Sequence, residues 1–161
     1  MIRNIESKDV EQICEIYNHY VENAVCTFEI EPVTVDEMTK RIENVTRAYP
    51  WIVAEEDGLI IGYAYAGKWK EREAYRFTVE TSVYIRCGYE GQRLGSTIYT
   101  SLIRRLRSQG VHAVIGGVVL PNEQSERLHE RLGFEKIGHF SEVGFKFDSW
   151  RDVGYWELIL K

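Results

Sequence analysis

The order of three sequence patterns over residues 78–110 constrains the fold most. A segment with strand character is followed by a glycine-rich loop and then by a long helical pattern. Residues 78–85 alternate and are rich in β-branched side chains, which predicts a strand. The helical pattern ends near Gly110, a residue typical of the position just beyond a helix. The apolar run 111–120 then predicts a buried second strand. Because a helix connects these two strands, we expect them to pair in parallel.

The rest of the chain supplies further strands and helices around this unit. The turn Glu56-Asp57-Gly58 lies between two apolar segments and predicts a hairpin. A connection with glycine and aromatic residues separates the last two predicted strands. We therefore expect an α+β fold, with helices packed on one mixed sheet, in a single domain spanning residues 1–161. The remaining predicted strands cover 2–5, 51–55, 59–66, 134–140 and 155–160, and the remaining helices cover 10–21, 34–45 and 121–133.

Composition narrows the classes of function. The 161 residues are 44% apolar, as in globular proteins, and the net charge of −5 disfavours nucleic-acid or anionic-membrane binding. The cysteines Cys14, Cys26 and Cys87 have no C-x-x-C spacing, which favours free thiols in a reducing compartment. The first residues lack a secretion-signal pattern, and no apolar run reaches the length of a membrane span. We expect a cytoplasmic protein.

The loop over residues 88–96 has the form of an anion site. Its glycines and the start of the following helix direct several backbone N–H groups at one point, where a pyrophosphate would fit. The pattern Gly91-x-x-x-Gly95 alone also fits a plain turn before a helix. Glu80 lies on the strand just upstream, so a phosphate-bearing cofactor would sit beside a candidate base.

Two stretches resemble the GNAT superfamily of N-acetyltransferases. One is the loop ending at Gly95, and the other reads Asn122-x-x-Ser125-x-x-Leu128-His129-x-x-Leu132-Gly133-Phe134. Further segments resemble the phosphinothricin acetyltransferase group, so the similarity covers nearly the whole chain. These segments are Thr27-Phe28, Arg72-Glu73-Ala74-Tyr75, Thr78-Val79-Glu80-x-Ser82-Val83-Tyr84 and Gly144-Phe145-Lys146-x-x-x-Trp150-x-Asp152-Val153.

The resemblance implies both a fold and a reaction. The fold is a mixed, mostly antiparallel sheet with a central splayed pair of parallel strands, flanked by helices. The reaction transfers an acetyl group from acetyl-CoA, without a metal, to the α-amine of an amino acid or analogue such as phosphinothricin, methionine sulfoximine or methionine sulfone. The resemblance also suggests a homodimer whose late hairpin approaches the partner's site.

The same resemblance assigns roles to individual residues. An amine is mostly protonated at neutral pH, so the reaction needs a base, and Glu80 has that role. His129 would protonate the departing thiolate. The alternatives are an outward-facing or arginine-paired carboxylate for Glu80 and a merely packed helix histidine for His129. The expected cofactor-binding residues are Val83, Tyr84, Ile85, Gly91, Gln92, Arg93, Leu94, Gly95, Ser96 and Asn122, and the expected substrate-binding residues are Phe28, Arg72, Tyr75, Glu80, Thr81 and Ser82.

Some of these residues also fit simpler roles. Arg72 matches a substrate carboxylate, but it also fits a solvated loop cation. Asn122 fits a pantetheine contact or the N-cap of the next helix. The cofactor loop departs from the superfamily pattern, because Glu90 stands where Arg or Gln is usual and Arg93 where Gly is usual. A left-handed backbone at Arg93 would cost about 1 kcal/mol or more, and Glu90 places a negative charge near the anion site.

The sequence is also compatible with two other functions. A protein N-terminal or lysine acetyltransferase would share the fold but would need an open groove. A non-catalytic CoA-binding regulatory module is suggested by the unusual residues Glu90 and Arg93.

Overall fold

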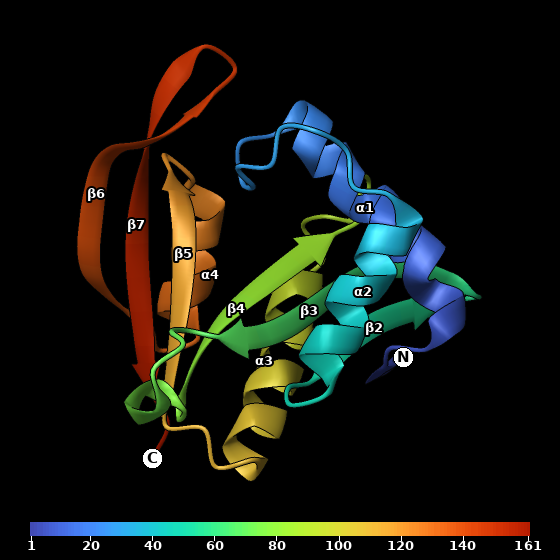
Figure 1. Cartoon of the computed structure of the whole chain (residues 1–161), viewed down its shortest axis with the longest axis horizontal. Helices are drawn as coiled ribbons and strands as arrows, with labels where there is room; N and C mark the ends of the chain where they lie inside the picture. Colours follow the sequence, from blue (N-terminus) through green and yellow to red (C-terminus); the bar gives the residue numbers. More distant parts are fainter.

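The sheet forms from segments in which side chains alternate between two faces, and short turns connect its hairpin strands. The computed structural model describes residues 1–161 and contains one seven-stranded sheet of order β1-β2-β3-β4-β5-β7-β6 (Figure 1). All neighbouring strands are antiparallel except β4 and β5, which are parallel as expected. The strands are β1 (Ile2–Asn4), β2 (Trp51–Glu56), β3 (Leu59–Lys68), β4 (Thr78–Ile85), β5 (Ala113–Leu120), β6 (Glu135–Lys146) and β7 (Ser149–Ile159).

The helices cover both faces of this sheet (Figure 1). Ile52 and Ala54 of β2 pack in a core with α3, whereas Trp51 and Val53 pack in a second core with α1 and α2. This separation follows from the alternation of side chains along a strand. No helix is long and apolar enough to cross a membrane. The helices are α1 (Val10–Asn23), α2 (Val35–Thr46), α3 (Leu94–Ser108) and α4 (Glu123–Arg131), with 3₁₀ turns η1 (Ser7–Asp9) and η2 (Glu73–Tyr75).

The parallel pair β4–β5 is joined over a short length only. Thr78, Val79 and Glu80 pair with Ala113, Val114 and Ile115, and no pairing between the two strands follows beyond Glu80. β4 continues to pair with β3 as far as Ile85 on its other edge. The strands therefore separate in the middle of the sheet, as the resemblance implied.

The C-terminal hairpin differs from the prediction. The expected connection between strands at 134–140 and 155–160 is itself mostly strand, because β6 and β7 are joined by only two residues. Phe147 and Asp148 both have positive φ angles, 53° and 55°, as in a tight hairpin turn. Most of β6 is exposed on both faces. The sequence pattern covered only the first part of β6, because the buried positions of the missed part, 141–146, are Gly144 and Lys146, and neither is an apolar side chain that would indicate a strand.

Candidate active site

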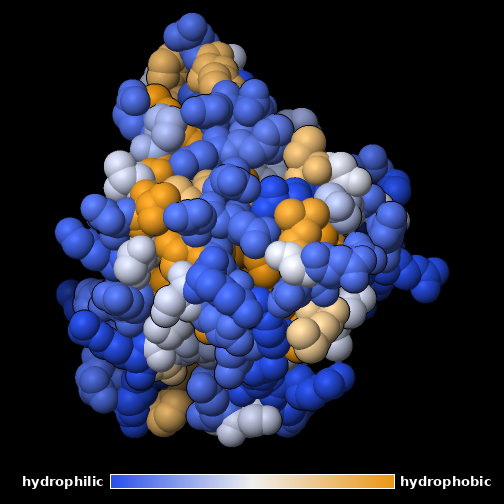
Figure 2. Space-filling view, turned by 90° about the vertical axis from the view of Figure 1, so that its right-hand side faces the viewer, coloured by the Kyte–Doolittle hydropathy of each residue, from blue (hydrophilic) through white to orange (hydrophobic).

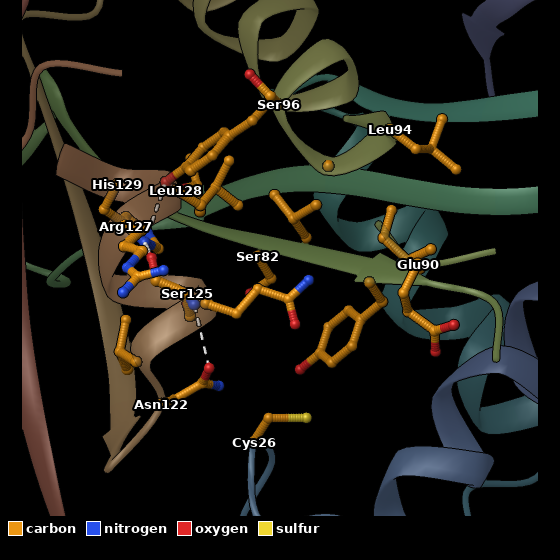
Figure 3. A pocket seen from close by; sticks show the side chains of 18 of the residues that line it. Cys26, Ser82, Glu90, Leu94, Ser96, Asn122, Ser125, Arg127, Leu128 and His129 are labelled. Atoms are coloured by element: carbon orange, nitrogen blue, oxygen red, sulfur yellow. Dashed lines mark hydrogen bonds between the residues drawn. The ribbon is translucent and has the colours of Figure 1, made fainter. Parts of the chain in front are cut away.

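A cavity of about 750 Å³ lies where β4 and β5 separate. Its lining comes from β4, the loop before α3, the start of α3, the end of β5 and α4, with Cys26 and Thr27 from the α1–α2 connection. In Figure 3, Asn122, Ser125 and His129 lie along one wall, Leu94 and Ser96 lie at the start of α3, Glu90 lies opposite that wall, and Cys26 lies below. The site is thus assembled from segments far apart in the sequence.

The splayed edge of β4 forms one side of the cavity. Val83, Tyr84 and Ile85, all expected to bind the cofactor, line it. Because β5 has turned away at this point, no strand satisfies the backbone groups on that edge of β4. Backbone N–H and C=O groups require partners, so this edge is suited to an extended ligand with amide groups.

The loop before α3 combines left-handed residues with a helix start. Gly88, Gly91 and Arg93 have φ angles of 92°, 86° and 60°, and Arg93 is the N-cap of α3. The positive φ that the sequence required of Arg93 is therefore present. The Glu90 carboxylate accepts a hydrogen bond from the Gly88 N–H at 2.7 Å, so it closes the loop on itself. Of the expected loop residues, Gly91, Arg93, Leu94, Gly95 and Ser96 line the cavity, and Gln92 lies outside its lining.

Glu80 is the last residue of β4 that pairs with β5, and it lines the cavity. Burial raises the pKa of its carboxyl group, and the nearby charge of Lys70 opposes this shift. Glu80 forms no salt bridge with an arginine. Gly117 faces it from β5, where an added Cβ atom would lie 3.6 Å from Glu80 Oε1. A carboxyl group with a raised pKa in a cleft is suited to proton transfer.

His129 lies on the other side of the same β5 segment. It is 7% exposed, and an added Cβ atom at Gly116 would lie 2.5 Å from its Nε2 atom. Its Nδ1 atom is 2.7 Å from the Ser125 carbonyl oxygen, and its Nε2 atom is 3.4 Å from the Tyr99 hydroxyl. Burial lowers the pKa of His129, although the Ser125 carbonyl opposes this shift. The imidazole is therefore neutral at physiological pH.

Asn122 has a structural role that its sequence position suggested. Its side-chain oxygen accepts a hydrogen bond from the Ser125 N–H at 3.1 Å, which makes it the N-cap of α4 (Figure 3). Its amide nitrogen takes no part in this cap, and Asn122 also lines the cavity. Capping and ligand contact are thus compatible in one side chain.

The expected substrate residues divide into two groups. Thr81 and Ser82 line the cavity, whereas Phe28, Arg72 and Tyr75 lie outside its lining. Arg72 and Tyr75 are exposed in the segment that leads into β4. The Phe28 ring occupies the space where a Cβ atom of Gly144 would be, so it joins the α1–α2 connection to the β6–β7 hairpin.

Sequence reasoning missed three contributors to the site. Tyr99 of α3 lines the cavity beside His129, and no motif in the sequence singled it out. Gly116 and Gly117 make room for the His129 and Glu80 side chains on opposite faces of β5. The interruption of an apolar strand by two glycines was the available signal for this close approach.

Comparisons with known proteins agree with this geometry. The model of the acetyltransferase (GNAT) domain family matches residues 2–154. A phosphinothricin N-acetyltransferase from Streptomyces viridochromogenes is 42% identical over 97% of this chain and 85% of its own length. An L-methionine sulfoximine/L-methionine sulfone acetyltransferase from Salmonella typhimurium is 35% identical over 99% of this chain and 94% of its own length.

A solved structure gives the same result for the fold. The GNAT superfamily phosphinothricin acetyltransferase from Sinorhizobium meliloti, in complex with acetyl-CoA, superposes with a TM-score of 0.97. It is 34% identical, and the match covers 99% of this chain and 88% of that one. The chain therefore belongs to the GNAT acetyltransferase family, and its fold is the GNAT fold.

We predict that Gly116→Ala displaces the His129 imidazole, because the new methyl group would lie 2.5 Å from Nε2 and 2.8 Å from Cδ2. Overpacking of this kind lowers the free energy of unfolding by roughly 1–3 kcal/mol. Gly138→Ala is the control, since a Cβ atom there meets nothing within 4 Å. Denaturant unfolding of both variants measures the difference. Equal stabilities would contradict the close packing of His129 on Gly116.

Proposed function

We propose that this protein transfers an acetyl group from acetyl-CoA to the α-amine of an amino acid or amino-acid analogue of the phosphinothricin, methionine sulfoximine or methionine sulfone type. One observation carries the proposal. Glu80, a carboxyl group with a raised pKa, lies where β4 and β5 separate and where the cavity begins. The names of the relatives indicate that they act on small amino-acid analogues, which supports the substrate class.

Acetyl-CoA fits the residues of the cavity. The free edge of β4 from Thr81 to Ile85 offers backbone groups to the amides of the pantetheine arm. The loop from Gly88 to Arg93 and the first turn of α3 offer N–H groups to the pyrophosphate, and the Arg93 guanidinium is its proposed ion partner. When bound, acetyl-CoA supplies the activated thioester that the amine attacks.

Glu80 is the proposed general base. The amine must lose a proton to become a nucleophile, and the Glu80 carboxylate takes it directly or through a water molecule. Burial of Glu80 raises its pKa and so brings its basicity closer to that of the amine. Backbone N–H groups on the free edge of β4 stabilise the negative charge that develops on the thioester oxygen.

His129 is the proposed donor of the proton that the departing thiolate needs. Gly116 contacts His129 and Gly117 faces Glu80, and successive residues of a strand point to opposite faces. Proton removal from the amine and protonation of sulfur are therefore assigned to opposite sides of the split sheet. In the neutral imidazole the Nδ1 proton is donated to the Ser125 carbonyl and Nε2 carries the lone pair, so Nε2 first takes a proton from solvent water and then gives it to the thiolate sulfur.

The segment before β4 is the proposed substrate rim. The centroids of the Trp69 and Tyr155 rings are 5.8 Å apart in an edge-on arrangement, and the charge of Lys70 acts on Glu80. The segment that contains Trp69 and Lys70 therefore lies next to the proposed base. Arg72 and Tyr75 belong to the same segment, and Arg72 is the proposed partner of the substrate carboxylate. Phe28 closes the rim from the α1–α2 connection through its contact with Gly144.

We predict that thiol release from acetyl-CoA is confined to compounds with a free α-amine and a free α-carboxylate. The test panel contains free amino acids, phosphinothricin, methionine sulfoximine, polyamines and short peptides. Turnover of peptides instead of amino acids would support the protein acetyltransferase. Binding of CoA with no turnover of any compound would support the regulatory module.

We predict that Glu80→Gln lowers kcat by roughly 10²–10⁴-fold and leaves the affinity for CoA unchanged, because only the base is lost. In the wild-type enzyme, kcat/KM falls as the pH falls through the raised pKa of Glu80, since only the carboxylate accepts a proton. This acidic limb disappears from the residual activity of the variant. The pH dependence of kcat/KM is measured for both proteins, and their CoA binding is measured separately by calorimetry. Unchanged turnover would exclude Glu80 as the base.

We also propose a homodimer formed through the β6–β7 hairpin. This hairpin projects from the body of the molecule at the top of Figure 1, and apolar side chains lie at the corresponding end in Figure 2. An exposed apolar surface of this kind marks an interaction site. Its exposed apolar residues are Ile137, Phe140, Val143, Phe145, Phe147 and Trp150.

We predict that the wild-type protein sediments at twice the 18.8 kDa mass of one chain and that Trp150→Asp shifts it to the monomer. Trp150 is 63% exposed and packs against Phe145, so a charge there disrupts the apolar surface without opening a core. Val35→Asp changes an exposed apolar residue at the start of α2 and serves as the control. A monomeric wild-type protein would exclude the dimer.

The proposed location is the cytoplasm. Cys14, Cys26 and Cys87 are all free thiols, which supports a reducing compartment.

A further inference from the structure

We propose that Tyr99 is a positioning residue for His129, and that a hydrogen-bonded chain from Thr81 through Tyr99 to His129 holds the imidazole in both of its protonation states. The inference rests on the proposed function, because it concerns the residue assigned to protonate the thiolate. Tyr99 is 1% exposed, Thr81 is 7% exposed, and both line the cavity. Nothing in the apolar pattern of α3 requires a hydroxyl group at this position.

The distances define a continuous chain. The Thr81 Oγ1 and Tyr99 Oη atoms are 2.5 Å apart, and Tyr99 Oη is 3.4 Å from His129 Nε2. At the far end, His129 Nδ1 lies 2.7 Å from the Ser125 carbonyl oxygen. The three side chains come from β4, α3 and α4, so the chain crosses the base of the cavity between three elements.

The Ser125 carbonyl fixes the tautomer of the neutral imidazole. A carbonyl oxygen only accepts, so Nδ1 carries the proton and Nε2 carries the lone pair. The Tyr99 hydroxyl then donates to Nε2 and accepts from the Thr81 hydroxyl. Every polar atom of the chain has a partner in this state, as buried polar groups require.

The same atoms also accommodate a protonated imidazole. When Nε2 gains a proton it donates to Tyr99, Tyr99 donates to Thr81, and Thr81 donates to the Ile115 carbonyl oxygen, which lies 3.5 Å from Thr81 Oγ1. The chain reverses its direction without any heavy atom moving. Hydroxyl groups donate and accept, so only a Tyr–Thr pair and not a Phe–Val pair allows this reversal.

No ionised side chain neutralises the imidazolium ion. The ring packs against Tyr99 of α3, Phe134, Trp156 of β7 and the backbone of Gly116 in β5, and none of these is charged. Lys136 lies over the Trp156 ring, and the charge of Glu80 acts on Tyr99 rather than on His129. The hydroxyl chain is therefore the main polar support for a proton on Nε2.

The test is the titration of His129 in the ligand-free protein, followed by ¹⁵N NMR of the imidazole nitrogens. A hydrogen bond from a charged group is roughly twice as strong as one between neutral groups, so Tyr99→Phe stabilises the imidazolium less than the wild type does. We expect the pKa of His129 to fall by roughly half a unit to one unit. We also expect kcat to fall about tenfold, with both KM values unchanged.

Three further variants separate positioning from packing. Thr81→Val removes the far hydroxyl and lowers the pKa of His129 in the same direction, whereas Thr81→Ser keeps the hydroxyl and restores the wild-type value. Tyr63→Phe removes a hydroxyl from a buried tyrosine of the other core and leaves the titration unchanged. An unshifted pKa of His129 in both Tyr99→Phe and Thr81→Val overturns the inference. Because the titration needs no turnover, a wild-type protein without acetyl transfer would contradict the proposed function alone.

Discussion

The separation of β4 from β5 after Glu80 is the constraint on which the site depends. A continuous ladder would satisfy the backbone of β4 internally and leave a closed sheet without a cavity. Because the ladder stops, one edge of β4 stays unpaired and borders a cavity that is also lined by α3 and α4. Open strand edges are normally avoided because they pair with other chains. Here the unpaired edge borders a cavity, so an extended ligand is the partner that fits it.

The proposed base and the proposed acid lie on different faces of the split sheet. Glu80 is the last residue of β4 that pairs with β5, and Thr81, the next residue, begins the hydroxyl chain to His129. Gly116 and Gly117 repeat this alternation on β5, where each leaves room for one of the two groups. A carboxyl group with a raised pKa and an imidazole with a lowered pKa thus remain apart, although both adjoin one cavity. Neither perturbs the titration of the other by direct contact.

The fold was largely predictable because most of its strands have one buried face or two. The parallel pair β4–β5 and the hairpin β2–β3 follow from apolar patterns and turn residues, and the GNAT family is confirmed by the comparisons. The full length of β6 was not predictable, because the buried positions of its second half are Gly144 and Lys146, which show no apolar period. For the site, Glu80 and the loop were candidates from the strand–loop–helix pattern, and His129 was a candidate from the resemblance to the GNAT superfamily. The pairing of Tyr99 with His129 depends on how α3 packs beside α4, which no local pattern encodes.

The loop before α3 combines two departures from the superfamily pattern at the proposed anion site. Glu90 accepts the Gly88 N–H, so its side chain holds the turn that precedes the left-handed Gly91 and Arg93. Because the Gly88 N–H is bonded within the loop, it is not among the N–H groups that the loop would offer to the proposed pyrophosphate. Arg93, which stands where the superfamily usually has glycine, is the left-handed N-cap of α3 and brings a guanidinium to the same loop. In the proposed complex this guanidinium would supply a charged donor to the phosphate on a loop that has given one N–H group to Glu90.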